Sequence, residues 1–299
     1  MDKDKIYGAL WGALCADAYA LGPHWEYNTK NIKDASLNWK GYNNPITSYH
    51  GKKTAGDFTH YGDQALWLLQ NLSEKSSFDL SAFGQKWMDE MQSYKGYMDH
   101  STKETIDNIK KGTDWTSCGS KSTDFSAIGR AVPLLLILSD KPVELKKAFM
   151  AQTALTHNSK SVVEAASFFA ELAVALLDGK EIHSALETIG STYSITIQDW
   201  IEQGLKSSTK KKTSLVIKTF GQACDISHGF PGVIHIISKY TDNYQLAMEE
   251  NAKSGGDSAA RGMTVGMILG LINGKKSIPE SWIENLNNKK EIYELISKI

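Results

Sequence analysis

Residues 159–177, SKSVVEAASFFAELAVALL, carry the clearest structural pattern in the sequence. Apolar residues recur here every three to four positions, which is the spacing that places them on one face of an α-helix. Asp178 and Gly179 follow directly, and a glycine after such a run commonly ends a helix. The stretch therefore predicts an amphipathic helix that buries one face against other helices.

The same helical spacing recurs through the rest of the chain. It predicts helices at residues 63–72, 142–155, 245–253, 257–271 and 289–299, and residues 125–138 form a nearly continuous apolar run. The one alternating segment, residues 192–197, is too short and isolated to build a sheet. Many modest helices joined by short loops predict an all-α fold, organised as one domain over residues 1–299. The polar segment 27–57 is the exception, and loops of that length are often functional.

Two of the predicted helices carry small residues at every fourth position. They are Gly8, Gly12, Ala16 and Ala20 near the N-terminus, and Gly262, Gly266 and Gly270 near the C-terminus. Glycine inside a helix costs about 1 kcal/mol relative to alanine, and a close helix–helix contact is the simplest compensation. Each stripe lies beside a carboxylate, Asp17 or Asp257, which makes a common site at those helix ends a second interpretation.

Composition excludes several functional classes. The chain has 299 residues with 33 Lys+Arg and 34 Asp+Glu, a formal net charge of −1, so no general nucleic-acid partner is expected. The best candidate for a membrane span, residues 263–272, is too short for one and predicts a buried helix instead. The cysteines, Cys15, Cys118 and Cys224, are odd in number and widely spaced, which favours a reducing cytoplasm over a disulfide framework or a zinc site.

Three short motifs place polar side chains at helix starts. Asp257 follows a Gly-Gly pair, Asp63 follows Gly62, and His157 follows a threonine before the helix of residues 159–177. Each fits an ordinary helix cap, and each also fits a site where an acidic or imidazole group is held at a fixed point for a ligand. Taken singly, the capping interpretation is the stronger one.

Five segments spread along the chain share a further pattern. They are residues 8–22 (GALWGALCADAYALG), 61–64 (YGDQ), 126–134 (SAIGRAVPL), 156–157 (TH) and 255–260 (GGDSAA). Their order and spacing resemble the ADP-ribosylglycohydrolase family, in its divergent J1-crystallin-like branch. They are similar to the family's opening helix, its Thr-Asp-Asp-Thr motif, its Met-Arg-x-x-Pro-Leu stretch, its Thr-His motif and its Gly-Gly-Asp-x-Asp-Thr/Ser motif. The likeness extends over nearly the whole chain.

The resemblance implies an all-α, orthogonal multi-helix bundle with a cleft for ADP-ribose and two magnesium ions. It implies hydrolysis of a glycosidic bond to ribose, in which Asp63, Asp257 and Glu26 are the candidate catalytic residues and Asp63 and Asp257 the candidate metal ligands. Hard cations and carboxylates suit the oxocarbenium-like transition state of that reaction. The residues expected to contact the ADP-ribose-containing substrate are Asp17, His24, Tyr61, Gln64, Ser126, His157 and Ser258.

Departures from the family pattern weaken the expected metal site. Gly62 and Ala259 replace two of four aspartates, Gln64 and Ala260 replace flanking hydroxyl residues, and Tyr61 replaces the leading threonine. Losing half of the anionic ligands should weaken cation binding severely, so at most one weakly held Mg²⁺ is expected, or none. We expect the carboxylates of Asp63 and Asp257 to face one another within about 8 Å, close enough to share that cation or a bridging water.

The glycine-rich phosphate loop of the family is also altered. It reads Asp124-Phe125-Ser126 here, and the acidic residue that follows the first helix in many members falls on His24, with Glu26 two residues late.

Three functional classes follow from these observations. The first is a glycosidase that acts on an ADP-ribosylated or related ribosyl compound, with a degenerate metal site. The second is a non-catalytic module that binds ADP-ribose or a nucleotide, and the third is a structural, J1-crystallin-like protein. Retention of both Asp63 and Asp257 favours the first class, since capping alone explains only part of it.

Overall fold

The structure, a computed structural model, describes residues 2–210 and 212–299. Its α-helices are α1 (Lys3–Ala20), α2 (Thr29–Asp34), α3 (His60–Lys75), α4 (Leu80–Ser93), α5 (His100–Lys110), α6 (Leu135–Leu138), α7 (Pro142–Thr156), α8 (Lys160–Leu177), α9 (Ile182–Gly190), α10 (Ile195–Ser207), α11 (Thr213–Phe220), α12 (Ile226–Lys239), α13 (Tyr244–Lys253), α14 (Ser258–Asn273), α15 (Glu280–Glu284) and α16 (Lys289–Ile296). Four short 3₁₀ segments are η1 (Ser48–His50), η2 (Phe125–Ala127), η3 (Gly129–Leu134) and η4 (Lys275–Ser277). Within the described ranges the only β pairings are two isolated bridges, so the all-α prediction is confirmed.

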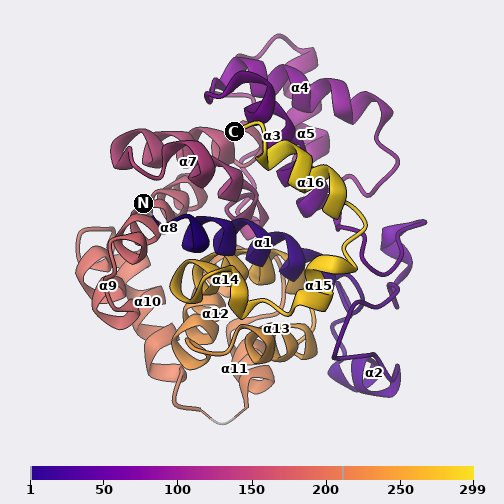
Figure 1. Ribbon diagram of the computed structural model, residues 1–299, viewed down its shortest axis with the longest axis vertical. Coiled ribbons are helices and arrows are strands. Elements are labelled where there is room, and N and C mark those ends of the chain that lie inside the picture. Colours follow the sequence, from indigo (N-terminus) through magenta and orange to yellow (C-terminus); the bar gives the residue numbers. More distant parts are fainter. Residues whose placement is uncertain (1, 211) are drawn as a thin grey trace.

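Helices α1 and α14 pack against each other at the centre of the molecule (Figure 1). Their glycines face one another, because a Cβ on Gly12 would lie 2.3 Å from the Gly266 carbonyl oxygen and a Cβ on Gly8 would lie 2.3 Å from that of Gly270. The close-contact interpretation of the two small-residue stripes is therefore confirmed. The pairing is antiparallel, so the end of α1 and the start of α14 lie at the same end of the contact.

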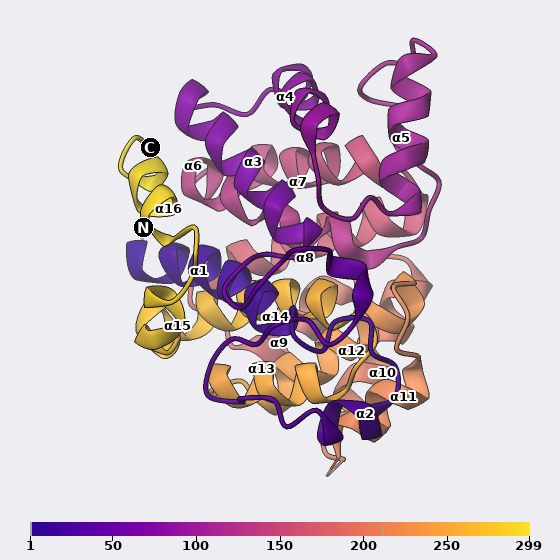
Figure 2. The same cartoon turned by 90° about the vertical axis from the view of Figure 1, so that its right-hand side faces the viewer.

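The remaining helices form two groups on either side of this pair. Helices α3, α4, α5 and α7 lie on one side and α11, α12 and α13 on the other, in both views (Figures 1 and 2). Figure 2 shows the polar segment between α1 and α3 running across the face on which α2 lies. That segment contains only α2 and η1 as regular structure, in agreement with the predicted long loop.

The predicted helices are observed, and two other segments differ from what their patterns indicate. The apolar run 125–138 is not one helix but η2, η3 and the single turn α6, and Pro133 lies inside η3. Proline has no backbone N–H to donate, so it interrupts a regular α-helix. The alternating segment 192–197 ends in the first turn of α10, which Ser194 caps. None of the described helices is both long and apolar enough to cross a bilayer.

Candidate active site

A turn of two glycines holds the start of α14 in place. Gly255 and Gly256 have φ values of +70° and +65°, which side chains rarely adopt, and a Cβ on Gly256 would lie 2.1 Å from the Gln222 carbonyl oxygen. The Trp25 N–H donates to the Gly256 carbonyl at 2.9 Å, and the Gly256 N–H donates to the Glu26 carbonyl at 2.8 Å. The loop after α1 thereby clamps the turn that carries Asp257.

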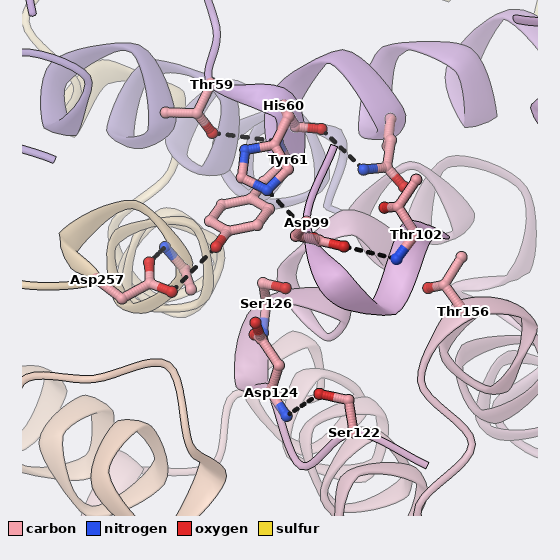
Figure 3. Close-up of polar contacts among 12 residues, drawn as sticks. Thr59, His60, Tyr61, Asp99, Thr102, Ser122, Asp124, Ser126, Thr156 and Asp257 are labelled. Carbon is pink, nitrogen blue, oxygen red and sulfur yellow. Dashed lines mark hydrogen bonds and ion pairs between the residues drawn. The ribbon is translucent and has the colours of Figure 1, made fainter. Parts of the chain in front are cut away.

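Asp257 is buried and joins two helices. It caps α14 by accepting a hydrogen bond from the Ala260 N–H at 3.1 Å, and it accepts a second from the Tyr61 hydroxyl at 3.0 Å. His24 Nδ1 lies 3.8 Å from Asp257 Oδ1, the oxygen that accepts the hydrogen bond from Ala260. The capping interpretation is correct for Asp257, but capping uses only part of the carboxylate. Figure 3 shows the Tyr61 ring reaching across to it.

A second carboxylate lies beside Asp257. One ligand atom each of Asp124, Cys224 and Asp257 lie within 4.8 Å of one another. Asp124 caps η2 by accepting a hydrogen bond from the Ser126 N–H at 2.8 Å, and the Phe125 N–H donates to the Cys224 carbonyl at 2.8 Å. The sequence marks residues 124–126 only as a departure from the glycine-rich loop, so this acidic pair was not predicted.

Burial controls the protonation of this pair. It raises the pKa of Asp124 to about 7, and the charge of Asp257 contributes in the same direction. Burial also raises the pKa of Asp257, but the Ala260 N–H, the Arg261 charge and the Tyr61 hydroxyl favour its ionised form. Two adjacent carboxylates that cannot both ionise share one proton. Because its neighbours favour the ionised form of Asp257, Asp124 is the member of the pair that holds the shared proton more readily.

Several buried polar atoms in this region have no hydrogen-bond partner among the residues that the structure describes. They are His24 Nε2, His60 Nδ1, Ser126 Oγ, His157 Nε2 and Ser258 Oγ. Buried polar groups are almost always satisfied, so a group of exceptions needs an explanation, such as a ligand or ordered water. Burial lowers the pKa of His157 to about 3 and that of His24 well below its usual value, so both imidazoles are neutral.

Aromatic rings form the outer edge of this region. The Trp25 ring stacks on His50 with centroids 5.3 Å apart and meets the Tyr97 ring edge-on at 4.6 Å. Tyr49 and Tyr97 are 53% and 36% exposed, respectively, whereas His50 is buried. Trp25 adopts a φ of +62°, a left-handed conformation that is uncommon for a bulky residue. The sequence contained no periodic pattern that could identify these rings, since they lie on three separate loops.

Comparison with known proteins identifies the family. The sequence pattern of the ADP-ribosylglycohydrolase family matches residues 1–299. The chain belongs to the ADP-ribosylglycohydrolase family. It is 22% identical to Crystallin J1A of Tripedalia cystophora and 23% identical to Crystallin J1B of the same organism, each over 99% of this chain and 96% of the relative. An uncharacterized protein of Archaeoglobus fulgidus is 22% identical over the same shares.

A solved structure has the same fold. The "ADP-ribosylglycohydrolase-related protein complex" superposes with a TM-score of 0.71 at 17% identity, covering 99% of this chain and 96% of that one. Such low identity shows the fold alone, so the chemistry of this member depends on its own residues.

Asp63, expected to share a cation with Asp257, has different partners. Its two oxygens accept hydrogen bonds from the Lys53 ammonium at 2.8 and 2.7 Å, and Oδ2 accepts another from the Tyr94 hydroxyl at 2.5 Å. Successive helix residues are rotated by about 100°, so Tyr61 and Asp63 project from nearly opposite sides of α3. Tyr61, not Asp63, contacts Asp257. The two aspartates therefore have separate hydrogen-bond partners, and the expected approach of their carboxylates to within about 8 Å stays a prediction.

Glu26 and Asp17 hold the structure together locally. The Glu26 carboxylate accepts hydrogen bonds from the Asn28 N–H at 2.7 Å and from Asn31 Nδ2 at 3.0 Å, so it supports the start of α2 and its predicted catalytic role loses support. Asp17 is fully buried and accepts hydrogen bonds from Thr59 N–H and Oγ1 at 2.7 and 2.6 Å. Burial raises the pKa of Asp17 to about 7.

Gln64 and His157 also have partners within the protein. Gln64 Oε1 accepts a hydrogen bond from Trp87 Nε1 at 2.9 Å and another from the Arg130 guanidinium, which also contacts His157 Nδ1 at 3.1 Å. Gln64 is therefore held in place by two buried partners. His157 Nε2 has no hydrogen-bond partner among the described residues. The expected contacts of both side chains with substrate stay predictions.

Asp99 was missed by the sequence and fixes His60 near the site. His60 Nε2 lies 3.2 Å from an Asp99 oxygen, and the other oxygen accepts a hydrogen bond from the Thr102 N–H at 2.6 Å (Figure 3). Burial opposes ionisation of Asp99, but the contact with His60 holds the pKa of Asp99 well below its usual range. His60 therefore presents Nδ1 in a fixed orientation.

Proposed function

We propose that the chain hydrolyses a glycosidic bond to ribose in an ADP-ribosylated or related ribosyl compound, with Asp124 and Asp257 as the two carboxylates. The observation that supports this most directly is the pair itself, two adjacent acids of which Asp124 has a pKa that burial raises to about 7. Glycoside hydrolysis uses such a pair, one group as acid and one as anion. Family membership supplies the ribosyl substrate class.

The environment assigns a role to each carboxylate. Asp124 donates its proton to the leaving-group atom as the glycosidic bond breaks, which requires a pKa near the working pH. Asp257 stays ionised and stabilises the positive charge that develops at the ribose C1 atom. A water molecule then forms the new C1–O bond and gives its proton to Asp124, which restores the acid. The Tyr61 hydroxyl and the Ala260 N–H fix its orientation. The short separation of the pair resembles the spacing of about 5–5.5 Å found in enzymes whose second carboxylate contacts the sugar directly.

The expected Mg²⁺ does not fit the residues present. A Cβ on Gly62 would lie 2.4 Å from Asp17 Oδ2, so a second aspartate cannot stand there without displacing buried groups. Asp63 already has an ammonium on its two oxygens, and Ala259 and Ala260 offer no side-chain oxygen. No step of the proposed reaction is therefore assigned to a metal.

The proposal predicts a pH profile that falls on the alkaline side. The rate constant kcat/KM should decline about tenfold per pH unit above about pH 7, because the pKa of Asp124 is raised to about 7 and the acid form is lost as pH rises. It should also decline at acid pH, where Asp257 takes up a proton. Asp124→Asn should remove the alkaline decline together with most of the rate. A rate that keeps rising from pH 7 to pH 9 would contradict the role of Asp124 as an acid.

A panel of substrates tests the proposal as a whole. Arginine-, serine- and thymine-linked ADP-ribose should be assayed for release of ADP-ribose, with binding of free ADP-ribose measured by calorimetry. Turnover of any of them supports the glycosidase, whereas binding without turnover supports a non-catalytic module. Absence of both supports a structural role, which the similarity to the two J1 crystallins favours.

Because the three cysteines are unpaired, we further propose a reducing cytoplasm as the location of the protein.

A further inference from the structure

Lys53 makes the most direct ionic contact with a residue at a family metal position. Its ammonium lies 2.8 and 2.7 Å from the two oxygens of Asp63, and its side chain is 24% exposed against 15% for Asp63. A lysine that spans both oxygens of a mostly buried carboxylate provides the positive charge that a bound cation would otherwise provide.

The loop around Lys53 is ordered by its own hydrogen bonds. The Lys53 N–H donates to the His50 carbonyl at 3.1 Å, and the next residue, Thr54, donates from its N–H to Asp57 at 2.8 Å. Asp57 in turn accepts a hydrogen bond from Asn287 Nδ2 at 2.8 Å. The ammonium is therefore held at Asp63 by a built turn that is tied to the C-terminal part of the chain.

A second buried acid lies within the influence of the same ammonium. The charge of Asp63 adds to burial in raising the pKa of Asp17, and the charge of Lys53 acts in the opposite direction. The Cβ that Gly62 lacks would lie 2.4 Å from Asp17 Oδ2 and 2.8 Å from the Phe58 side chain. Packed side chains therefore fill the space next to Asp17. The Lys53 ammonium already balances the negative charge of Asp63.

We propose that Lys53 is a cation built into the chain, and that its ammonium excludes a divalent ion from Asp63. The site has been converted from a metal site into an internal ion pair, and it has not simply lost ligands. This inference concerns the side of α3 opposite Tyr61, so it does not depend on the reaction proposed for Asp124 and Asp257.

Manganese binding to the folded chain tests the inference. Mn²⁺ is titrated to 10 mM, a range set by the weakest oxygen sites at about 1 mM, and bound ion is measured by water-proton relaxation. Lys53→Met preserves the length of the side chain and removes its charge. This variant should gain one Mn²⁺ site at Asp63, with an affinity at least tenfold higher than that of Asp63 in the wild type. The double variant Lys53→Met/Asp63→Asn should lose that site again. Lys52→Met, which removes an exposed neighbouring lysine, should behave as the wild type.

Two results would overturn the inference. One is a Lys53→Met variant that remains folded by circular dichroism and binds no more Mn²⁺ than the wild type. The other needs no change at Lys53: if Asp63→Asn lowers Mn²⁺ binding below that of the wild type, then the ammonium does not exclude the ion. Equal binding by the wild type and Asp63→Asn supports the inference even if Lys53→Met does not fold. Binding common to all variants arises elsewhere and cancels in the comparison.

Discussion

Replacing Asp257 with asparagine should lower turnover of an ADP-ribosyl substrate by about 100-fold or more, because the charge that faces the developing cation is removed. The amide oxygen can still accept a hydrogen bond from the Ala260 N–H, the contact that caps α14. We therefore expect the free energy of unfolding to change by no more than about 1 kcal/mol. Steady-state rates and denaturant titrations on the same preparations separate the two effects.

Asp79 provides a matched control for this substitution. It caps α4 by accepting a hydrogen bond from the Ala82 N–H at 2.7 Å in an exposed position. Asp79→Asn repeats the chemical change at a helix start outside the proposed site, so it should leave the rate unaltered. If Asp257→Asn retains more than about a tenth of the wild-type rate, a shortfall of under 1.4 kcal/mol, the carboxylate does not act in the chemical step.

Replacing Gly266 with alanine should destabilise the protein by about 3 kcal/mol. The new Cβ would lie 2.3 Å from the Gly12 carbonyl oxygen and 2.7 Å from the carbonyl carbon. Both atoms belong to the backbone of α1, so no side chain can rotate away and the two helices must separate. The higher helix propensity of alanine offsets only about 1 kcal/mol of this cost. Denaturant unfolding measures the difference.

Gly41 provides the comparison for Gly266. A Cβ at Gly41 meets only the end of the Asn38 side chain, at 3.4 Å, so Gly41→Ala should change the free energy of unfolding by no more than about 0.5 kcal/mol. Equal effects of the two substitutions would show that the contact between α1 and α14 adjusts more easily than its geometry indicates.

Most of the fold could be predicted from sequence because it depends on short-range periodicity. Helical spacing located α8 and α14 to within a residue or two, and the small-residue stripes anticipated the contact between α1 and α14. The run 125–138 misled because its apolar residues fit a helix, whereas Pro133 and the turn into η3 determine the backbone there. This segment is largely buried and has no polar face, so its sequence pattern cannot distinguish an α-helix from other backbone conformations.

The site could be predicted only where a motif marks it. Asp257 and His157 lie in recognisable motifs, and the structure places both among buried polar groups. Asp124 and Lys53 were not predicted as site residues, because their roles arise when loops distant in the sequence meet. A carboxylate at a helix start looks the same in sequence whether it only caps, as Asp79 does at α4, or whether it also lies beside a second acid, as Asp257 does.

The central position of α1 has a consequence for how the chain reaches its folded state. Nearly every residue of α1 is buried, and its principal partner, α14, begins more than 230 residues later in the sequence. At about 5–20 residues per second, some 240 further residues take tens of seconds to emerge from the ribosome. During that interval α1 has its earlier partners, such as α3 and η3, but lacks the face that α14 later covers, so we expect this face to remain open to non-native contacts until α14 has been made.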